Sequence, residues 1–199
     1  MVFAMSMMVC VPAFAAESKS DDAYQFSIEA NSKQLETINA IKGTDMTVYE
    51  FYKTVYPEIA SRFSSSQKAN YNSVKYPWKD VLKNDNGTVT TNGVGGSKSY
   101  LLQYTDHSLE STSETEYVSS DTPVMITIDS YILNSDSKVV ASGSNVEFDS
   151  KSCSANATLD DPTVGAKYRA EGVHVITNED GVYPPIITQT TYSYWYTAK

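Results

Sequence analysis

The spacing of the apolar residues changes once along this chain, and that change constrains the fold more than any other feature. Before about residue 84 the apolar residues recur at helical spacing. From Tyr100 onward they alternate with polar residues, which is typical of antiparallel strands with one buried face. The sequence therefore predicts an α+β fold: short N-terminal helices over residues 16–84, a Gly/Asn-rich linker or hairpin over 85–97, and an antiparallel β-sandwich over 98–199.

Local signals mark where the helices begin. Thr47 and Glu50 form a capping box, in which the Thr47 hydroxyl accepts from the Glu50 amide and the Glu50 carboxylate accepts from the Thr47 amide. Pro57 is expected to end that helix and to start the next one, because proline is tolerated in a first turn but not inside a helix. Further helices are expected over residues 31–42 and over 58–63, and Ser65 or Ser66 is expected to cap another helix that runs to Tyr71.

The alternation is clear over residues 124–133. Val124, Ile126, Ile128 and Ile132 face one way, and Thr127, Asp129 and Tyr131 face the other. One apolar face and one polar face predict a half-buried strand. Further strands are expected over residues 138–141, 145–149, 152–159, 167–177 and 186–197, with a hairpin turn at Ser142, Gly143 and Ser144.

Residues 1–15 predict a secretory signal peptide. A short apolar run ends in small residues around Ala13, Phe14 and Ala15, as at an A-x-A cleavage site, and the run is too short to remain as a membrane anchor. No Lys or Arg precedes the run, so either the true start lies upstream of Met1 or the chain is a fragment. We expect a secreted, extracellular protein with no membrane attachment after cleavage.

The low cysteine content favours a protein that is exported from a bacterium. Cleavage would remove Cys10 and leave Cys153, so an intramolecular disulfide is not expected. Small secreted eukaryotic domains tend to be rich in disulfides, which favours a bacterial origin for this chain. Cys153 shares its alternation face with Ala155, Ala157 and Leu159, and is therefore expected to be a small buried apolar side chain.

The net charge argues against two classes of partner. The chain carries a formal charge of −9, with 15 Lys and Arg against 24 Asp and Glu. Nucleic acids and anionic lipid surfaces are bound by clustered cations, so neither is an expected partner. An unknown extracellular partner remains, and a polysaccharide is one candidate.

The last expected strand carries a row of aromatic residues. Tyr192, Tyr194 and Tyr196 would share one face, with Trp195 on the other. An exposed row of tyrosines can act as a platform on which sugar rings stack. The same row is also what cross-strand packing would produce, because tyrosine is favoured in strands. Both interpretations stay open on the sequence alone.

Two further groups of residues are candidate chemical sites. Residues 106–136 are acidic and rich in Ser and Thr, and would be either a calcium-binding loop or a solvated polar loop. His107 lies between Asp106 and Ser108, but adjacent strand residues point to opposite faces and cannot form a triad. His174 is expected to be a structural histidine on a half-buried strand. No nucleotide-binding, metalloprotease or hydrolase motif occurs, and no metal or cofactor is expected.

The layout resembles small, uncharacterised secreted proteins of Gram-positive, clostridial-type bacteria. The resemblance rests on residues 13–15, 47–51, 168–172 and 192–196, and it implies no catalytic residues. The leading hypothesis is a secreted, non-enzymatic protein that binds or assembles at the cell exterior. The alternative is a carbohydrate-binding module that uses the tyrosine platform, and a secreted hydrolase comes third.

Overall fold

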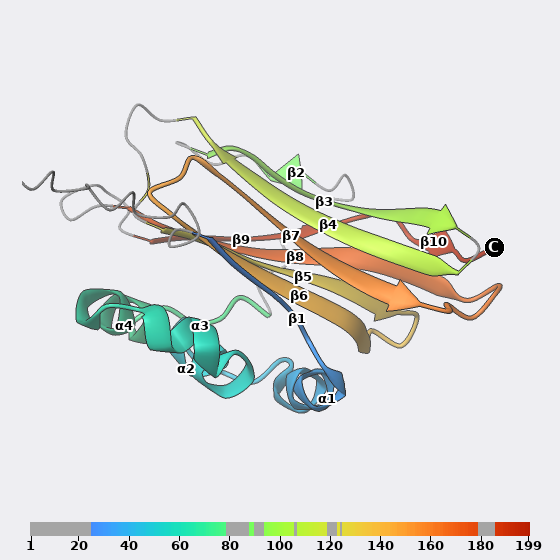
Figure 1. Cartoon of the computed structure of the whole chain (residues 1–199), viewed down its shortest axis with the longest axis horizontal. Helices are drawn as coiled ribbons and strands as arrows, with labels where there is room; N and C mark the ends of the chain where they lie inside the picture. The colour runs from blue at the N-terminus through green and yellow to red at the C-terminus, as the bar shows by residue number, and fades with distance from the viewer. Residues whose placement is uncertain are drawn as a thin grey trace, which may run out of the picture.

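The computed structural model describes residues 25–78, 88–89, 94–105, 107–118, 123, 125–178 and 186–199. Their elements form three layers: a four-stranded sheet, a six-stranded sheet, and helices on the far side of the larger sheet (Figure 1). The predicted α+β class, with antiparallel sheets packed against each other, is confirmed. The predicted signal peptide lies outside the described residues.

The described helices begin at a capping box, except one that begins at Pro57, and the sequence predicts both the box at Thr47 and the start at Pro57. The Thr47 hydroxyl accepts from the Glu50 amide at 3.2 Å, and a Glu50 carboxylate oxygen accepts from the Thr47 amide at 2.7 Å. Equivalent boxes start at Asn31 and at Ser64. Ser64 lies one residue before Ser65, the first of the two residues expected to cap that helix. The helices are α1 (Ser32–Ile41), α2 (Val48–Val55), α3 (Pro57–Arg62) and α4 (Ser65–Asn72).

Within each of the two sheets, the described strands pair in the antiparallel direction. The larger sheet runs in the order β1-β6-β5-β8, and β9 and β10 both pair with β8. The smaller sheet runs in the order β2-β3-β4-β7. The strands are β1 (Gln25–Glu29), β2 (Thr88–Val89), β3 (Val94–Thr105), β4 (Ser108–Tyr117), β5 (Met125–Asn134), β6 (Val139–Phe148), β7 (Ser152–Asp160), β8 (Lys167–Thr177), β9 (Ile186–Tyr192) and β10 (Tyr196–Thr197).

Three expectations about the strands were wrong. The region expected to be helical opens with a strand, β1, which pairs with β6 at the edge of the larger sheet. The hairpin expected at Ser142–Ser144 does not form, because β6 runs through those residues. The strand expected over residues 186–197 is interrupted at residues 193–195, between β9 and β10.

Gly143 explains why a Ser-Gly-Ser sequence lies inside a strand. The backbone carbonyl of Asn156 on β7 passes so close to Gly143 that a Cβ atom there would overlap it. Glycine at this position serves the close approach of the two sheets and not a turn.

The β5 strand has the predicted two faces, but both are buried. Ile126, Ile128 and Ile132 face the smaller sheet, and Asp129 and Tyr131 are covered by the helices, with no exposed surface. The expectation of a half-buried strand was wrong because the helices form a third layer over the polar face. Thr127 is buried on that face as well.

The interior between the two sheets is apolar at both ends and polar in the middle. Ile126 and Ile128 belong to one apolar cluster, and Ile132 belongs to the other. Between them, buried hydroxyl groups bond to one another across the layers, as Ser111 and Ser113 do with Ser130 at 2.8 and 3.0 Å. Cys153 is buried in the first cluster, as the alternation predicted.

None of the helices described is long and apolar enough to cross a bilayer.

Candidate functional site

The most exposed aromatic side chains described in the structure lie where the β9 strand ends. Tyr194 is 74% exposed and Trp195 is 45% exposed. The chain leaves the sheet ladder here, because the Ser193 hydroxyl takes the place of a backbone acceptor and accepts from the Ala170 amide at 2.8 Å. The Ser193 amide donates to the Ala170 carbonyl at 3.0 Å. The interruption places two aromatic residues at the surface, next to an edge of the larger sheet.

Arg169 on β8 fixes two of the rings. Its guanidinium carbon lies 4.6 Å from the centroid of the Tyr192 ring and 5.0 Å from the centroid of the Trp195 ring. These are cation–π distances, and Arg is the cation that most often makes such contacts. One Arg169 nitrogen also lies 4.0 Å from a carboxylate oxygen of Glu171, which is almost wholly buried. Burial raises the pKa of Glu171, and the Lys42 and Arg169 charges offset part of that rise.

The structure thus separates the predicted tyrosine row into different environments. Tyr192 is half-buried beside Arg169, and Tyr194 stands out from the surface. Tyr196 lies on β10, where its hydroxyl donates to Gln103 Oε1 at 2.6 Å. Trp195, expected on the opposite face, joins Tyr192 around Arg169. We call Arg169, Tyr192, Tyr194 and Trp195 the aromatic cluster.

Arg169 is the member that sequence reasoning missed. The signal was present, because alternation along β8 places Arg169 on the opposite face from Tyr168 and Ala170. What the alternation cannot provide is the register of β8 against β9, which pairs Glu171 with Tyr192 and so brings the guanidinium to the rings.

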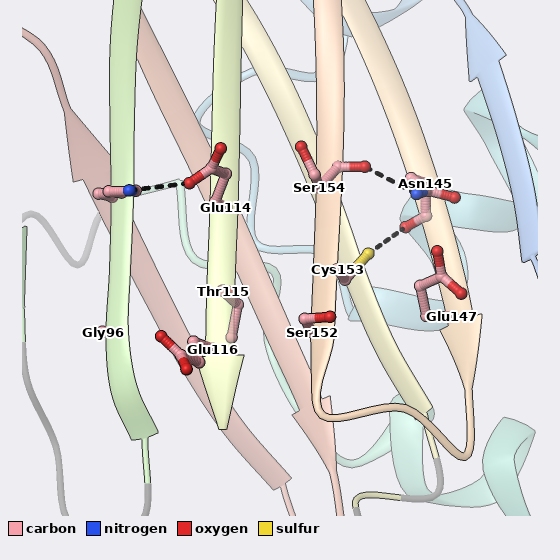
Figure 2. Close-up of a pocket in the computed structure, with 10 residues that line it drawn as sticks. Gly96, Glu114, Thr115, Glu116, Asn145, Glu147, Ser152, Cys153 and Ser154 are labelled. Carbon is pink, nitrogen blue, oxygen red and sulfur yellow. Dashed lines mark hydrogen bonds and ion pairs between the residues drawn. The ribbon is translucent and has the colours of Figure 1, made fainter. Parts of the chain in front are cut away.

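A second surface is a polar groove of about 620 Å³ at the other end of the sandwich (Figure 2). It runs over three strands of the smaller sheet and reaches β6 of the larger one, the strand next to the edge strand β1. Its walls carry charged and hydroxyl side chains rather than aromatic ones. The lining residues are Gly96, Lys98, Glu114, Thr115, Glu116, Asn145, Glu147, Ser152, Cys153 and Ser154.

Of the charged side chains that line the groove, Lys98 and Glu114 form an ion pair with each other. Lys98 Nζ lies 2.9 Å from one carboxylate oxygen of Glu114, and the Tyr100 hydroxyl donates to the other at 2.7 Å. Hydrogen bonding to Tyr100 lowers the pKa of Glu114, and Lys98 adds to this. Among the residues described, Glu116 and Glu147 form no ion pair within 4 Å. Partial burial raises the pKa of Glu147, because desolvation disfavours its charged form.

Cys153 and His174 are built into the interior and not into a reactive site. The Cys153 thiol donates to the Asn145 carbonyl at 3.8 Å, and burial raises its pKa well above the ordinary value, so it stays protonated. The His174 ring lies between the hydroxyls of Thr115, at 2.7 Å, and Thr191, at 2.8 Å. Burial lowers the pKa of His174 to about 3, and the ring is neutral at physiological pH.

The described part of the acidic stretch, residues 106–136, is mostly strand and not a loop. Glu110, Glu114 and Glu116 lie on β4, and Asp129 lies on β5, so the stretch is divided between two sheets. Among the described residues no three His, Cys, Asp or Glu side chains come together as a metal site would require. His107 lies on an exposed turn, and its neighbour Asp106 is outside the described residues.

Comparison with known proteins adds little to this geometry. No protein-family model and no curated protein matches the chain. A β-glucuronidase of glycoside hydrolase family 2 aligns with 48% of this chain at a TM-score of 0.31 and 19% identity. A putative β-galactosidase from Bacteroides fragilis aligns with 46% at a TM-score of 0.30 and 14% identity. The chain spans 11% and 15% of those proteins, and at these TM-scores the likeness carries no argument about function.

Proposed function

We propose that this chain is an exported, non-catalytic protein that binds a neutral carbohydrate at the cell exterior through the aromatic cluster. The observation that carries the proposal is the exposure of Tyr194 and Trp195 beside a sheet edge. Large exposed apolar side chains that lie together mark binding surfaces in soluble proteins. Export is supported by the apolar run and the A-x-A pattern at residues 13–15.

Aromatic rings suit a sugar because they offer a flat apolar surface and, in Tyr and Trp, a polar edge. The apolar face of a pyranose can stack on the ring while the Tyr194 hydroxyl and the Trp195 indole N–H bond to its hydroxyl groups. Arg169 holds the Tyr192 and Trp195 rings in place before any ligand arrives. A ring that is already fixed loses less conformational entropy on binding, which favours affinity.

The charge of the protein indicates which carbohydrates to expect. With a formal net charge of −9, the protein repels polyanions at long range. Acidic polysaccharides are therefore disfavoured, and the expected ligands are neutral glycans.

A glycan array tests the proposal with three variants. Trp195→Ala should lower the affinity for the glycans that the wild type retains by about tenfold or more, as expected for an aromatic residue at the centre of a binding surface. Tyr194→Ala should also weaken binding. Leu102→Ala is the matched control, because Leu102 is an exposed apolar residue on β3, outside the aromatic cluster, and is 42% exposed. Its binding should equal that of the wild type.

Two results would contradict the proposal. One is that the folded wild type retains no glycan. The other is that Trp195→Ala and Leu102→Ala bind glycans equally well, which would place the binding surface elsewhere.

A further inference from the structure

Four tyrosines link one helical segment to the larger sheet by hydrogen bonds. The segment is residues 47–78, which include α2, α3 and α4, and we call it the helical cap (Figure 1). The hydroxyl of each tyrosine bonds to a side chain on the sheet, and the four residues are Tyr52, Tyr56, Tyr71 and Tyr76. Two of them, Tyr52 and Tyr76, donate to the same atom, Asp129 Oδ2, at 2.9 and 2.6 Å. The contact between cap and sheet is therefore centred on one carboxyl group.

Asp129 has no positive charge beside it. Its side chain is wholly buried, and among the described residues it has no ion pair within 4 Å and no hydrogen-bond partner for Oδ1. Its pairing partners on β6 and β8, Ser144 and Val173, do not titrate. The titratable groups around it on the other elements are uncharged at physiological pH, because burial raises their pKa values; they are Tyr52, Tyr56, Tyr71, Tyr76, Tyr131 and Cys153. A charge on Asp129 is therefore costly, since nothing of opposite sign compensates it.

The charges further along β8 do not fill this role. Glu171 lies on the same face of the sheet as Asp129, two residues from Val173. The Lys42 and Arg169 charges offset part of the rise that burial causes in the pKa of Glu171. Neither cation contributes to the pKa of Asp129.

Asp129 and His174 lie on opposite sides of the larger sheet. Asp129 faces the cap, whereas His174 lies between the two sheets, bonded to Thr115 of the smaller sheet and to Thr191 of β9. Burial raises the pKa of the Asp129 carboxyl to about 6 and lowers the pKa of the His174 ring to about 3. Moving the cap away from the sheet would expose Asp129 to water and leave His174 covered.

We propose that the helical cap is held on the larger sheet by the protonated form of Asp129, so that acid tightens the cap–sheet interface while it loosens the interface between the two sheets. The device needs no ligand and is independent of carbohydrate binding. Near pH 5 the buried carboxyl keeps its proton. Near pH 7 it is ionised, and separation of the cap returns the charge to water, where a carboxylate is most stable. Opening of the cap therefore becomes easier as the pH rises from about 4 to about 7.

Amide hydrogen exchange of the full chain at pH 5 and pH 7 tests the proposal, with the rates expressed as protection factors to remove the pH dependence of the exchange chemistry. Protection of the amides in α2 and α4 should fall about tenfold from pH 5 to pH 7, as expected for a carboxyl whose pKa is 3.8 in water and about 6 under the cap. Amides of β8 beside His174 should keep or gain protection over the same range, because an opening that exposes His174 becomes harder as the pH rises.

Three variants locate the effect. Asp129→Asn keeps the shape of the side chain without its titration, so protection of the cap should not change between pH 5 and pH 7. Tyr76→Phe removes a hydrogen bond to the charged form, which raises the pKa of Asp129 further and should enlarge the fall in protection. Glu58→Gln is the control, since Glu58 is an exposed carboxylate on α3, and its fall should equal that of the wild type.

Parallel changes in the protection of the cap amides and the β8 amides would overturn the proposal, as would a wild-type fall that persists in Asp129→Asn. If Asp129→Asn does not fold, Tyr76→Phe decides. A fall in that variant no larger than the fall in Glu58→Gln would also overturn the proposal.

Discussion

Replacing Asp129 by Asn should make the protein lose stability steeply as the pH falls, whereas replacing His174 by Gln should make it gain stability over part of the same range. The two groups are both wholly buried, and burial shifts their pKa values in opposite directions. Burial raises the pKa of Asp129 to about 6 and lowers the pKa of His174 to about 3. The variants separate two effects that cancel in the wild type.

The sign follows from which state holds the proton. Between about pH 4 and pH 6 the folded protein has protonated Asp129 while the unfolded chain has released that proton, so the Asp129 contribution to stability rises as the pH falls. Between about pH 3 and pH 6.5 the unfolded chain has protonated His174 while the folded protein has not, so the His174 contribution falls as the pH falls. The two pH ranges overlap between about pH 4 and pH 6. There the folded protein holds one proton on Asp129 and the unfolded chain holds one on His174, so the two contributions cancel in the wild type.

The geometry around each group supports these directions. Asp129 Oδ2 accepts from the Tyr52 hydroxyl at 2.9 Å and from the Tyr76 hydroxyl at 2.6 Å, and these bonds offset only part of the cost of burial. For His174, each ring nitrogen has one threonine hydroxyl as its partner and no carboxylate contributes to its pKa. Gln at position 174 can keep bonds to both hydroxyls without titrating.

Urea unfolding at pH 7 and pH 4.5 measures the effect. Between pH 7 and pH 4.5, and relative to the wild type, Asp129→Asn should lose about 2 kcal/mol more stability, and His174→Gln should lose about 2 to 3 kcal/mol less. All other carboxylates, including Glu171, titrate in every variant and cancel in the difference. Parallel pH profiles for the three proteins would contradict the assignment of these two groups as buried and oppositely shifted.

Gly143→Ala should be among the most damaging single substitutions in the chain. The added Cβ would overlap the backbone carbonyl of Asn156, and backbone cannot rotate aside as a side chain can. The two sheets would have to separate where β6 meets β7. We expect a loss of about 4 kcal/mol or more, or failure to fold, which is the range of severe core overpacking.

Gly96→Ala is the matched control for this substitution. Gly96 is also a strand glycine, but a Cβ atom there would have nothing within 4 Å. Its midpoint in urea should stay close to that of the wild type. Equal stability of the two alanine variants would show that the sheets are not in close contact at Gly143.

The parts of the fold that were predictable are those that neighbouring residues decide. The capping box at Thr47 and Glu50 lies within one turn of helix, and Pro57 acts on its own backbone, so both could be predicted from the sequence. The period of two along β5 likewise follows from successive residues. These signals do not depend on how the layers pack.

The parts that were not predictable depend on residues far away in the chain. Asp129 is buried because Tyr52 and Tyr76 come from segments more than 50 positions earlier. The Ser-Gly-Ser sequence around Gly143 is typical of a turn until β7 is seen to pass over it. The aromatic cluster required the register of β8 against β9, which alternation along one strand does not contain.

The central claim is that carbohydrate binds at the aromatic cluster, and the indole N–H resonances test it most directly. The chain contains two tryptophans. Trp78 is buried against Phe51 and Tyr76, whereas Trp195 is exposed beside Arg169. Titration of ¹⁵N-labelled protein with a neutral oligosaccharide should shift the Trp195 indole resonance in proportion to saturation and leave that of Trp78 in place. Saturable binding of the oligosaccharide with an unmoved Trp195 resonance would contradict the account.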